Sequence, residues 1–530
     1  MPFRLPSPTR ALLTGSVLLV LMLLSACEAP TAPPTRPNII YIMADDHARR
    51  TIGAYGDGLH TTPNLDRIAH EGALFLNSFC GNSICGPSRA TILTGLHSHK
   101  NGVTGNSRPW DSTQTVFPSL LRQAGYQTAL FGKWHLNNRP ADEYDTYKIL
   151  TGAGKQGFYY NPAFYDSETG RDTTMEGYAT DLVTDEALRW LDTERSADDP
   201  FLLLVQYKAP HVPRMPPLRM LDRYLDDTIP EPPTLHDDLA TRSVYARQVN
   251  FFLDEYRPLP AYGTYDPAAH TIYVARMSEA QLQAYHAAVD PQNEAYREML
   301  ASGALADSAA HRSYVYQRFI KDYLRIVDTI DENVGRLLDW LDAHPELRDN
   351  TVVVYASDQG YFTGEHGYAE KRLMYEAALQ MPLLMRWPAG IAPGTRVESL
   401  VQNIDYAPTF LDLAGVPIPP TMQGRSLRPV LDAEAPPDWR EAIYYHYYDH
   451  MRHRVGRHAG VRTARYKLIH FYTDDTWEFY DLEADPLEVR NVYGDPTYAE
   501  PIETMKATYE RLRTTYEVPA STFEPPFAAP

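Results

Sequence analysis

Three apolar runs that each end in polar side chains constrain most strongly how this chain can fold. The runs are residues 38–43, 201–206 and 351–355. Continuous apolar segments of this length are typical of strands buried on both faces, as in parallel sheets. Asp45 and Asp46 follow the first run, His211 comes shortly after the second, and Asp358 and Gln359 follow the third. Because ligands bind outside the carboxyl ends of strands in open α/β sheets, the pattern predicts an active site at that edge.

Segments with helical periodicity alternate with these strands. Apolar residues recur at steps of three and four over residues 318–344, which predicts a long amphipathic helix. Shorter helices are predicted over residues 63–71, with Asn64 as the N-cap, and over residues 88–94. This alternation predicts an α/β fold with a large, mostly parallel sheet covered by helices.

Two regions depart from the alternation. Residues 214–312 contain several proline clusters and many tyrosines, and we interpret them as an insertion with a helix near residues 279–286. Such an insertion is either a wall of the substrate cleft or filler. Near the C-terminus, short tyrosine-rich alternating segments predict a small antiparallel sheet, packed against a helix over residues 501–516. The predicted organisation is a catalytic domain of residues 38–430 and an α+β subdomain of residues 431–530.

Residues 1–26 have the features of an export signal. Basic residues precede a short apolar stretch that ends in Leu24-Ser25-Ala26-Cys27. The small residues predict a bacterial lipoprotein signal cleaved before Cys27, with lipid on that thiol; an ordinary signal peptide with a chance cysteine is the alternative. Residues 27–37, rich in proline, would form an extended tether. We expect an exported protein, lipid-anchored at a bacterial membrane in the periplasm or at the cell surface.

The net charge argues against nucleic acid as a partner. The 530 residues include 68 Asp and Glu against 49 Lys and Arg, which gives a formal charge of −19. A chain this acidic has no general attraction for phosphate backbones, so an anionic substrate must be held by a local group of cationic side chains. No disulfide framework is expected, since Cys27 would carry lipid and Cys80 lies in an apolar context typical of a core residue.

Cys85 opens the run Cys85-Gly86-Pro87-Ser88-Arg89, which leads into a predicted helix. The positive end of a helix lowers the pKa of a cysteine placed there and attracts anions. This placement suits a nucleophile that acts on an anionic substrate.

The carboxylates at the strand ends are candidate metal ligands. Asp45 and Asp46 are adjacent and repel each other unless a cation holds them. Asp358 and Gln359 offer two further oxygens. Hard oxygen ligands at this density suit Ca²⁺ best and Mg²⁺ next. Each pair alone is better explained as a helix cap or a solvated turn.

Several cationic side chains stand in defined local contexts. Lys133 and His135 lie two apart in Gly132-Lys133-Trp134-His135, His211 lies between two prolines, and Lys371 precedes Arg372. A lone Lys or His is usually a solvated or core side chain, and we interpret Arg372 in that way.

The run from Cys85 to Arg89, followed by Thr94-Gly95, closely resembles the signature of the type I, formylglycine-dependent sulfatases. The resemblance extends from Asn38 to about Tyr516 and is closest to bacterial enzymes similar to N-acetylglucosamine-6-sulfatase. The runs that carry it are residues 90–103, 357–376 and 444–470. It implies an alkaline-phosphatase-like sandwich and hydrolysis of sulfate esters on carbohydrates, with 6-O-sulfated N-acetylglucosamine as the expected sugar.

The resemblance also implies roles for the candidate residues. A maturation enzyme would oxidise Cys85 to formylglycine (3-oxoalanine), whose hydrate attacks sulfur. One Ca²⁺ would be held by Asp45, Asp46, the modified Cys85, Asp358 and Gln359. In the family's pattern, Arg89 and Lys133 fix the formylglycine and the sulfate, His135 assists breakdown of the sulfated diol, and His211 and Lys371 protonate or stabilise the leaving alkoxide. Gln359 stands where Asn or His is common and offers the amide oxygen on a longer arm, and Gly86 stands where Ser or Thr is common.

Other interpretations stay open at this point. His458 and Arg462 either contact substrate or belong to the start of a structural strand. The same superfamily contains phosphodiesterases and phosphonate hydrolases, and sulfatases for other sugars, such as iduronate-2-sulfatase-like enzymes. A binding protein on an inactive scaffold is a third alternative, which the completeness of the catalytic set disfavours.

Overall fold

The computed structural model describes residues 1–3, 36–253, 271–431 and 435–523. Apart from residues 1–3, the predicted signal peptide lies outside these residues, as do Cys27 and nearly all of the tether. The chain divides into two units, Met1–Arg36 and Pro37–Pro530, and the description below concerns the second. Among the described residues, no helix combines the length and the apolar character that crossing a membrane requires.

A mixed sheet of 10 strands forms the centre of the second unit. Its four central strands, β9, β1, β8 and β4, are all parallel to one another, whereas β10, β6 and β7 pair antiparallel with their neighbours. In sheet order the strands are β11 (Thr395–Val397), β2 (Ala73–Phe75), β10 (Leu383–Arg386), β9 (Thr351–Ser357), β1 (Asn38–Ala44), β8 (Phe201–Gln206), β4 (Gln127–Gly132), β5 (Thr146–Thr151), β6 (Ala163–Asp166) and β7 (Arg171–Thr174).

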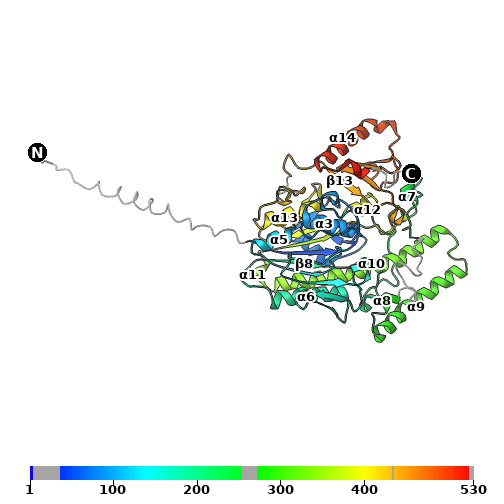
Figure 1. Cartoon of the computed structure of the whole chain (residues 1–530), viewed down its shortest axis with the longest axis horizontal. Helices are drawn as coiled ribbons and strands as arrows, with labels where there is room; N and C mark the ends of the chain where they lie inside the picture. Colours follow the sequence, from blue (N-terminus) through cyan, green and yellow to red (C-terminus); the bar gives the residue numbers. More distant parts are fainter. Residues whose placement is uncertain (4–35, 254–270, 432–434, 524–530) are drawn as a thin grey trace. The chain divides into compact units, whose positions relative to one another are not determined.

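Helices cover both faces of this sheet because the side chains of each central strand alternate between two apolar clusters. Along β1, Ile39 and Tyr41 belong to one cluster, and Ile40 and Ile42 belong to the other. The helices α3, α5 and α13 lie on one side of the sheet and α6 and α10 on the other (Figure 1). The longer helices are α2 (Pro63–His70), α3 (Cys85–Thr94), α5 (Phe117–Gln123), α6 (Ala179–Thr193), α9 (Glu279–Ala301), α10 (Ser308–Asp342), α13 (Tyr406–Leu413) and α14 (Ala499–Thr515).

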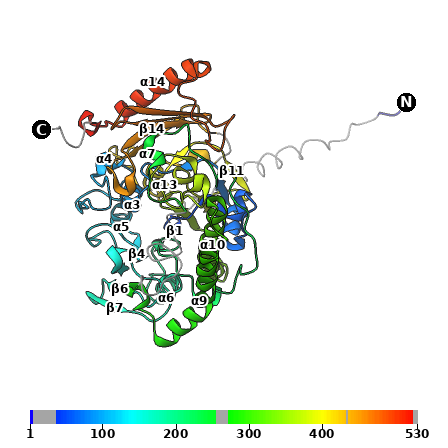
Figure 2. The same ribbon diagram turned by 90° about the vertical axis from the view of Figure 1, so that its right-hand side faces the viewer.

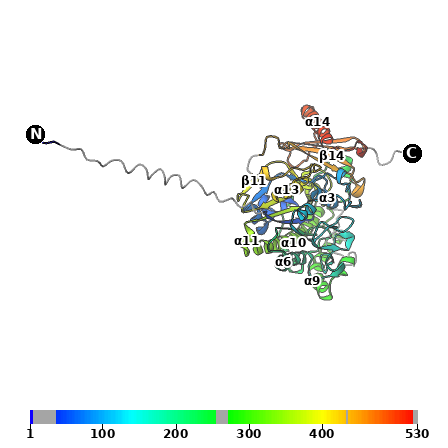
Figure 3. The same ribbon diagram turned by 60° about the vertical axis from the view of Figure 1, so that its left-hand side comes forward.

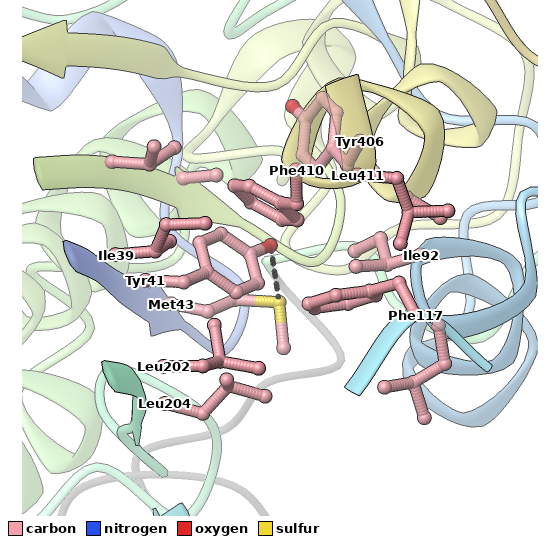
Figure 4. Packing of buried hydrophobic residues seen from close by; sticks show 14 of the residues in the cluster. Ile39, Tyr41, Met43, Ile92, Phe117, Leu202, Leu204, Tyr406, Phe410 and Leu411 are labelled. Atoms are coloured by element: carbon pink, nitrogen blue, oxygen red, sulfur yellow. Dashed lines mark hydrogen bonds between the residues drawn. The ribbon is translucent and has the colours of Figure 1, made fainter. Parts of the chain in front are cut away.

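Aromatic packing joins the sheet to the helices on the α13 side. The Tyr41 ring lies between β1 and α13, with its centroid 5.3 Å from that of Phe410, and Phe117 packs 4.8 Å from Phe410 on the other side. Figure 4 shows these rings around the strand, with the Tyr41 hydroxyl donating to the sulfur of Met43. This layer fixes the position of β1, whose end carries Asp45 and Asp46.

A second sheet contains the C-terminal strands. Its four antiparallel strands run in the order β13 (Ala442–Tyr447), β14 (His458–Thr463), β15 (Tyr466–Phe471) and β16 (Thr476–Asp481). Helix α14 packs on this sheet through Ile502, Met505 and Tyr509, on the side of the unit away from α6 and α9 (Figures 2 and 3). A short pair, β3 (Ser78–Phe79) with β12 (Val401–Gln402), completes the strands.

The predicted fold is confirmed, and the differences concern the ends of helices. Helix α10 begins ten residues before the predicted start, where Asp307 caps it by accepting from the Ala310 amide. Helix α9 continues well past residue 286. The remaining short helices are α4 (Ser98–Asn101), α7 (Val244–Arg247), α8 (Thr271–Val274), α11 (Pro345–Arg348) and α12 (Glu376–Leu379).

The predicted N-cap of α2 is wrong. Thr62, not Asn64, holds the cap position, and its side chain makes no capping hydrogen bond. The carboxylate of Asp331 on α10 accepts instead from the amides of Asn64 and Leu65, at 3.0 and 2.8 Å. A long-range partner therefore satisfies this helix end, and local sequence rules cannot detect it.

Candidate active site

The carboxyl ends of four neighbouring parallel strands place the predicted site residues at one edge of the sheet. Asp45 and Asp46 follow β1, and Asp358 and Gln359 follow β9. Lys133 follows β4 directly. His211 follows β8 after a short loop whose Ala209 carbonyl accepts from the Asp45 amide at 2.9 Å. The sheet topology alone thus brings together residues that are up to about three hundred positions apart.

Helix α3 presents its first turn to this edge. Cys85 is the first residue of the helix and is completely buried. One turn later, the Arg89 guanidinium donates to Asp358 Oδ2 through Nε at 3.1 Å and to the Lys133 carbonyl through Nη1 at 2.8 Å. Arg89 therefore connects the helix to the ends of β9 and β4. The helix was predicted to begin at residue 88, and it begins three residues earlier.

Lys133 is held against Asp45. Its ammonium forms an ion pair with Asp45 Oδ2 and donates to Gln156 Oε1 at 3.2 Å. The preceding Gly132 has φ +112°, and a Cβ atom there would lie 1.9 Å from the carbonyl oxygen of Gln206. Glycine is required at this point because β4 passes too close to β8 for any side chain.

Lys371 connects Asp46 with Cys85. Its Nζ donates to both carboxylate oxygens of Asp46, at 2.5 and 2.6 Å, and lies 3.3 Å from the Cys85 sulfur. Gln359 makes the corresponding pair of contacts: its Nε2 donates to Asp46 and lies 3.8 Å from the same sulfur. We call Asp45, Asp46, Cys85, Arg89, Lys133, Asp358, Gln359 and Lys371 the catalytic cluster.

Two histidines lie beside the cluster. His211 Nδ1 contacts the Val212 carbonyl at 2.6 Å, and its Nε2 lies 3.8 Å from Asp46 Oδ2. His135 has φ +56°, and its Nδ1 is buried without a hydrogen-bond partner among the described residues. Burial lowers the pKa of both rings well below the usual value, and Lys133 adds to the lowering.

Burial and crowding of like charges perturb the acidic groups. Burial disfavours ionisation of Asp45, but Lys133 and the other cations outweigh it and hold its pKa well below the usual range. The pKa of Asp46 is raised by burial and by Asp45, against the opposing effect of Lys371. Burial, with Asp45 second, raises the pKa of Asp358 to about 7. Three carboxylates cannot all ionise easily here without additional positive charge.

The predicted low pKa of Cys85 is wrong for the unmodified thiol. Burial raises the pKa of Cys85 far above the usual value, Asp45 raises it further, and Lys371 and Lys133 only partly oppose this. Loss of solvent is the largest cause, and it disfavours the charged thiolate. The bare thiol is therefore a poor nucleophile at this position.

Two oxygens in the catalytic cluster lack partners. Asp45 Oδ1 and Gln359 Oε1 are buried and accept no hydrogen bond from the described residues. Oxygens of Asp45, Asp46 and Asp358 lie within 4.8 Å of one another, close enough to bind a single cation. Unpaired buried acceptors are costly, and a hard divalent cation prefers oxygen ligands of this kind. The donor set fits a divalent metal site.

Most of the chain, including all residues of the catalytic cluster, matches models of known protein families. The model of the sulfatase family matches residues 37–416, and that of the C-terminal region of N-sulphoglucosamine sulphohydrolase matches residues 364–515. The chain belongs to the sulfatase family. The sulfatase is thus an enzyme of the sulfuric ester hydrolase class, as the sequence indicated.

Individual relatives agree with this assignment. The N-acetylglucosamine-6-O-sulfatase of Bacteroides thetaiotaomicron is 43% identical over 492 residues, which cover 90% of this chain and 86% of the relative. Human N-acetylglucosamine-6-sulfatase is 27% identical, over 93% of this chain and 86% of its own. A structure solved in complex with its substrate D-glucosamine-2-N,6-O-disulfate superposes with a TM-score of 0.86 at 42% identity, covering 92% of this chain and 99% of that one.

The two predicted substrate-binding residues lie outside the catalytic cluster of this sulfatase. His458 is fully buried among aromatic rings, with its centroid 5.3 Å from that of Tyr447 and 5.0 Å from that of Phe471, and its Nδ1 contacts the Gly456 carbonyl at 2.9 Å. Arg462 forms an ion pair with Glu376 at 3.1 Å. Among the described residues, neither side chain makes a hydrogen bond or ion pair with the cluster.

Arg462 belongs to a second buried group of charges, which joins the C-terminal sheet to helix α12. Lys467 Nζ lies 2.8 Å from Glu376 Oε1 and 2.5 Å from Glu488 Oε1, and Glu488 Oε2 accepts from the Glu376 amide at 2.7 Å. We call Glu376, Arg462, Lys467 and Glu488 the junction network. Its member Glu376 lies five residues beyond Lys371 in the chain, so the network anchors the segment that carries Lys371.

Sequence reasoning did not identify four side chains that contact the cluster or its neighbours. Asn106 Oδ1 accepts from the Gly86 amide at 2.9 Å, and Gln156 and Gln206 accept from Lys133 and Arg89. Lys208 is buried beside His211. Gln206 ends an apolar strand, so the strand-end rule could have indicated it; Asn106 and Gln156 come from loops that carry no such signal.

Proposed function

We propose that this sulfatase hydrolyses the 6-O-sulfate ester of N-acetylglucosamine-type sugars. The observation that supports it most directly is the 43% identity, over nearly the whole chain, to a relative named for that activity. The catalytic cluster supports it further, because it places cations, carboxylates and a helix N-terminus around Cys85.

We propose formylglycine at Cys85 as the nucleophile. In its hydrated form, that group supplies a hydroxyl able to attack sulfur. Lys371 lies close enough to Cys85 to orient this hydroxyl, and Arg89 and Lys133 supply further positive charge in the cluster. Fixed cations stabilise the charge that the sulfuryl oxygens develop in the transition state.

Asp45, Asp46, Asp358 and Gln359 would hold one Ca²⁺, with Mg²⁺ as the second choice. The unpaired oxygens of Asp45 and Gln359 support this assignment. A bound cation would supply charge that polarises a sulfate oxygen. It would also relieve repulsion among the carboxylates.

His211 is the proposed general acid. A sugar alkoxide is a poor leaving group, so its departure requires a proton from a positioned side chain. With Nδ1 bound to the Val212 carbonyl, the ring directs Nε2 toward Asp46. With Nδ1–H kept on the Val212 carbonyl, His211 would act in its doubly protonated form and pass the Nε2 proton to the ester oxygen. His135 would assist release of sulfate from the modified residue.

Two neighbouring activities are alternatives. A phosphonate monoester hydrolase from Silicibacter pomeroyi has a TM-score of 0.67 at 22% identity, which shows the fold alone. Mouse iduronate 2-sulfatase is 24% identical. Both are more distant than the relatives named for action on 6-sulfated glucosamine.

A substrate panel tests the proposal. The protein is co-expressed with a formylglycine-generating enzyme and offered defined sulfated mono- and disaccharides, an aryl phosphodiester and a phosphonate monoester. We expect sulfate release from 6-O-sulfated N-acetylglucosamine, measured by ion chromatography. Faster turnover of 2-sulfated uronic acids or of the phosphorus esters would overturn the assignment. Mass spectrometry of the peptide containing Cys85 tests the modification separately.

We further propose export and lipid anchoring through Cys27, from the motif at residues 24–27. Metabolic labelling with a tagged fatty acid tests this. Label should appear in the wild type and be absent from Cys27→Ser.

A further inference from the structure

Lys208 is a buried cation next to the proposed acid, and the proposed function gives it no role. It lies two residues beyond β8 and is 3% exposed. Among the described residues it forms no ion pair; its Nζ lies 5.0 Å from the centroid of the Tyr159 ring and donates to the Val212 carbonyl at 3.3 Å. Buried lysines are rare unless they are paired, so this one needs a specific explanation.

The Val212 carbonyl is a shared acceptor. It receives Lys208 Nζ at 3.3 Å and lies 2.6 Å from His211 Nδ1. A carbonyl can only accept, so Nδ1 must carry the ring proton that makes this contact. The tautomer of a histidine is set by the hydrogen bond that its other nitrogen makes. Here that bond leaves Nε2 as the nitrogen that lies 3.8 Å from Asp46.

The turn that carries His211 is fixed from two sides. The Tyr159 hydroxyl donates to the His211 carbonyl at 2.7 Å, and the Tyr159 ring also faces the Lys208 ammonium. The His211 amide donates back to the Lys208 carbonyl at 3.1 Å. Lys208 thus closes a small ring of contacts that includes both the backbone and the side chain of the turn.

We propose that Lys208 is a positioning residue that fixes the orientation and tautomer of His211 through the Val212 carbonyl. This inference rests on the proposed function, since it assigns His211 as the acid. Without the lysine, the carbonyl can rotate away from Nδ1, and Nε2 no longer points reliably at the leaving oxygen. Misplacement of a catalytic group by a small distance is costly in rate.

The charge of Lys208 is secondary to its hydrogen bond. Burial, and next the Lys133 ammonium, lower the pKa of Lys208 to about 7. A neutral amine still carries N–H donors, so the contact with the carbonyl persists in both forms. Orientation of His211 should therefore not be lost when Lys208 deprotonates.

Leaving-group dependence tests the proposal in the modified enzyme. Lys208→Met has similar length but no donor. We expect kcat on 6-O-sulfated N-acetylglucosamine to fall by about 10-fold or more, because this substrate needs an acid. The rate on nitrophenyl sulfate, whose leaving group needs none, should fall by less than about threefold. In a His211→Ala background, Lys208→Met should cause no further loss on the sugar.

Equal losses on both substrates, or an additive loss in the His211→Ala background, would overturn the proposal. A second measurement does not depend on the variant folding. Nitrogen-15 NMR of histidine-labelled wild type, assigned by the signal missing from His211→Ala, should show a protonated Nδ1, whether or not Nε2 also carries a proton. An unprotonated Nδ1 would overturn the proposal even with full activity. Absence of sulfate release from every sugar by wild type would instead count against the proposed function.

Discussion

This protein contains two buried groups of charged side chains that are similar in composition. They differ in whether their acceptor oxygens have hydrogen-bond or ion-pair partners. In the junction network, each of the four carboxylate oxygens of Glu376 and Glu488 has a partner. In the catalytic cluster, Asp45 Oδ1 and Gln359 Oε1 have none among the described residues. A complete network holds elements together, whereas unpaired buried acceptors are expected where a ligand completes the set.

The largest expected effect is a loss of activity on changing the catalytic cluster, which should not follow from changing the junction network. Replacing Cys85 by Ala removes the proposed nucleophile, so sulfate release should fall by a factor of at least ~10⁴. The melting temperature should change little, because no backbone contact is lost.

Cys80→Ala is the matched control for this prediction. Cys80 is also fully buried, but its sulfur contacts the Asn82 and Asp358 carbonyls, not Lys371. This variant should keep most of its activity. Comparable activity losses in the two variants would mean that packing, not nucleophilicity, explains the effect.

The junction network should respond in stability instead. Lys467→Met leaves Glu376 and Glu488 buried without their shared cation, and breaking a buried pair on one side costs about 3–5 kcal/mol. Denaturant unfolding measures this loss. Lys100→Met, which removes an exposed pair with Glu517, should cost at most about 1 kcal/mol. Equal costs would show that the network is not effectively buried.

Calcium should stabilise the catalytic cluster alone. Adding the ion to chelated protein at about one hundred times its Kd should raise the free energy of unfolding by about 2.7 kcal/mol. Asp45→Asn should abolish this response, and Glu376→Gln should retain it, whatever its own stability. A response of the wild type to Mg²⁺ but not to Ca²⁺ would correct the choice of metal.

The smallest effect concerns His458, which lies on β14, the strand that also carries Arg462. Burial lowers its pKa to about 4 in the folded protein, against about 6.5 in an unfolded chain. As the pH falls below the unfolded value, the unfolded state binds a proton that the folded state does not, so stability falls until about pH 4. Relative to His458→Phe, the wild type should lose about 1.4 kcal/mol between about pH 7.5 and about pH 5.5.

The same variant addresses substrate binding by His458. Because the ring packs among Tyr445, Tyr447 and Phe471, His458→Phe should leave KM for the sugar unchanged at neutral pH. A KM that rises several-fold would support the interpretation that this residue contacts substrate.

The sequence predicted what local patterns determine. The central strands and the antiparallel C-terminal strands were found because their periodicities are clear, and the strand-end rule placed Asp45, Asp358 and His211 at one edge. The sequence could not predict contacts between residues that are far apart in the chain. Asp331 caps α2 from another helix, Asn106 reaches Gly86 from a loop, and burial overturns the expected pKa of Cys85. Such effects depend on distance and solvent, which sequence spacing does not encode.

The complete burial of Cys85 has a consequence for the order of events during biosynthesis. The residue is 0% exposed and begins a helix packed inside the domain. The proposed oxidation of Cys85 to formylglycine would therefore require the chain while that helix is still unformed. Oxidation and folding would then compete in time, and a molecule that folded first would keep an unmodified thiol. Incubating folded, unmodified protein with the maturation enzyme should yield no aldehyde, whereas a peptide spanning residues 80–95 should be converted. Slower folding would then raise the active fraction without any change in sequence.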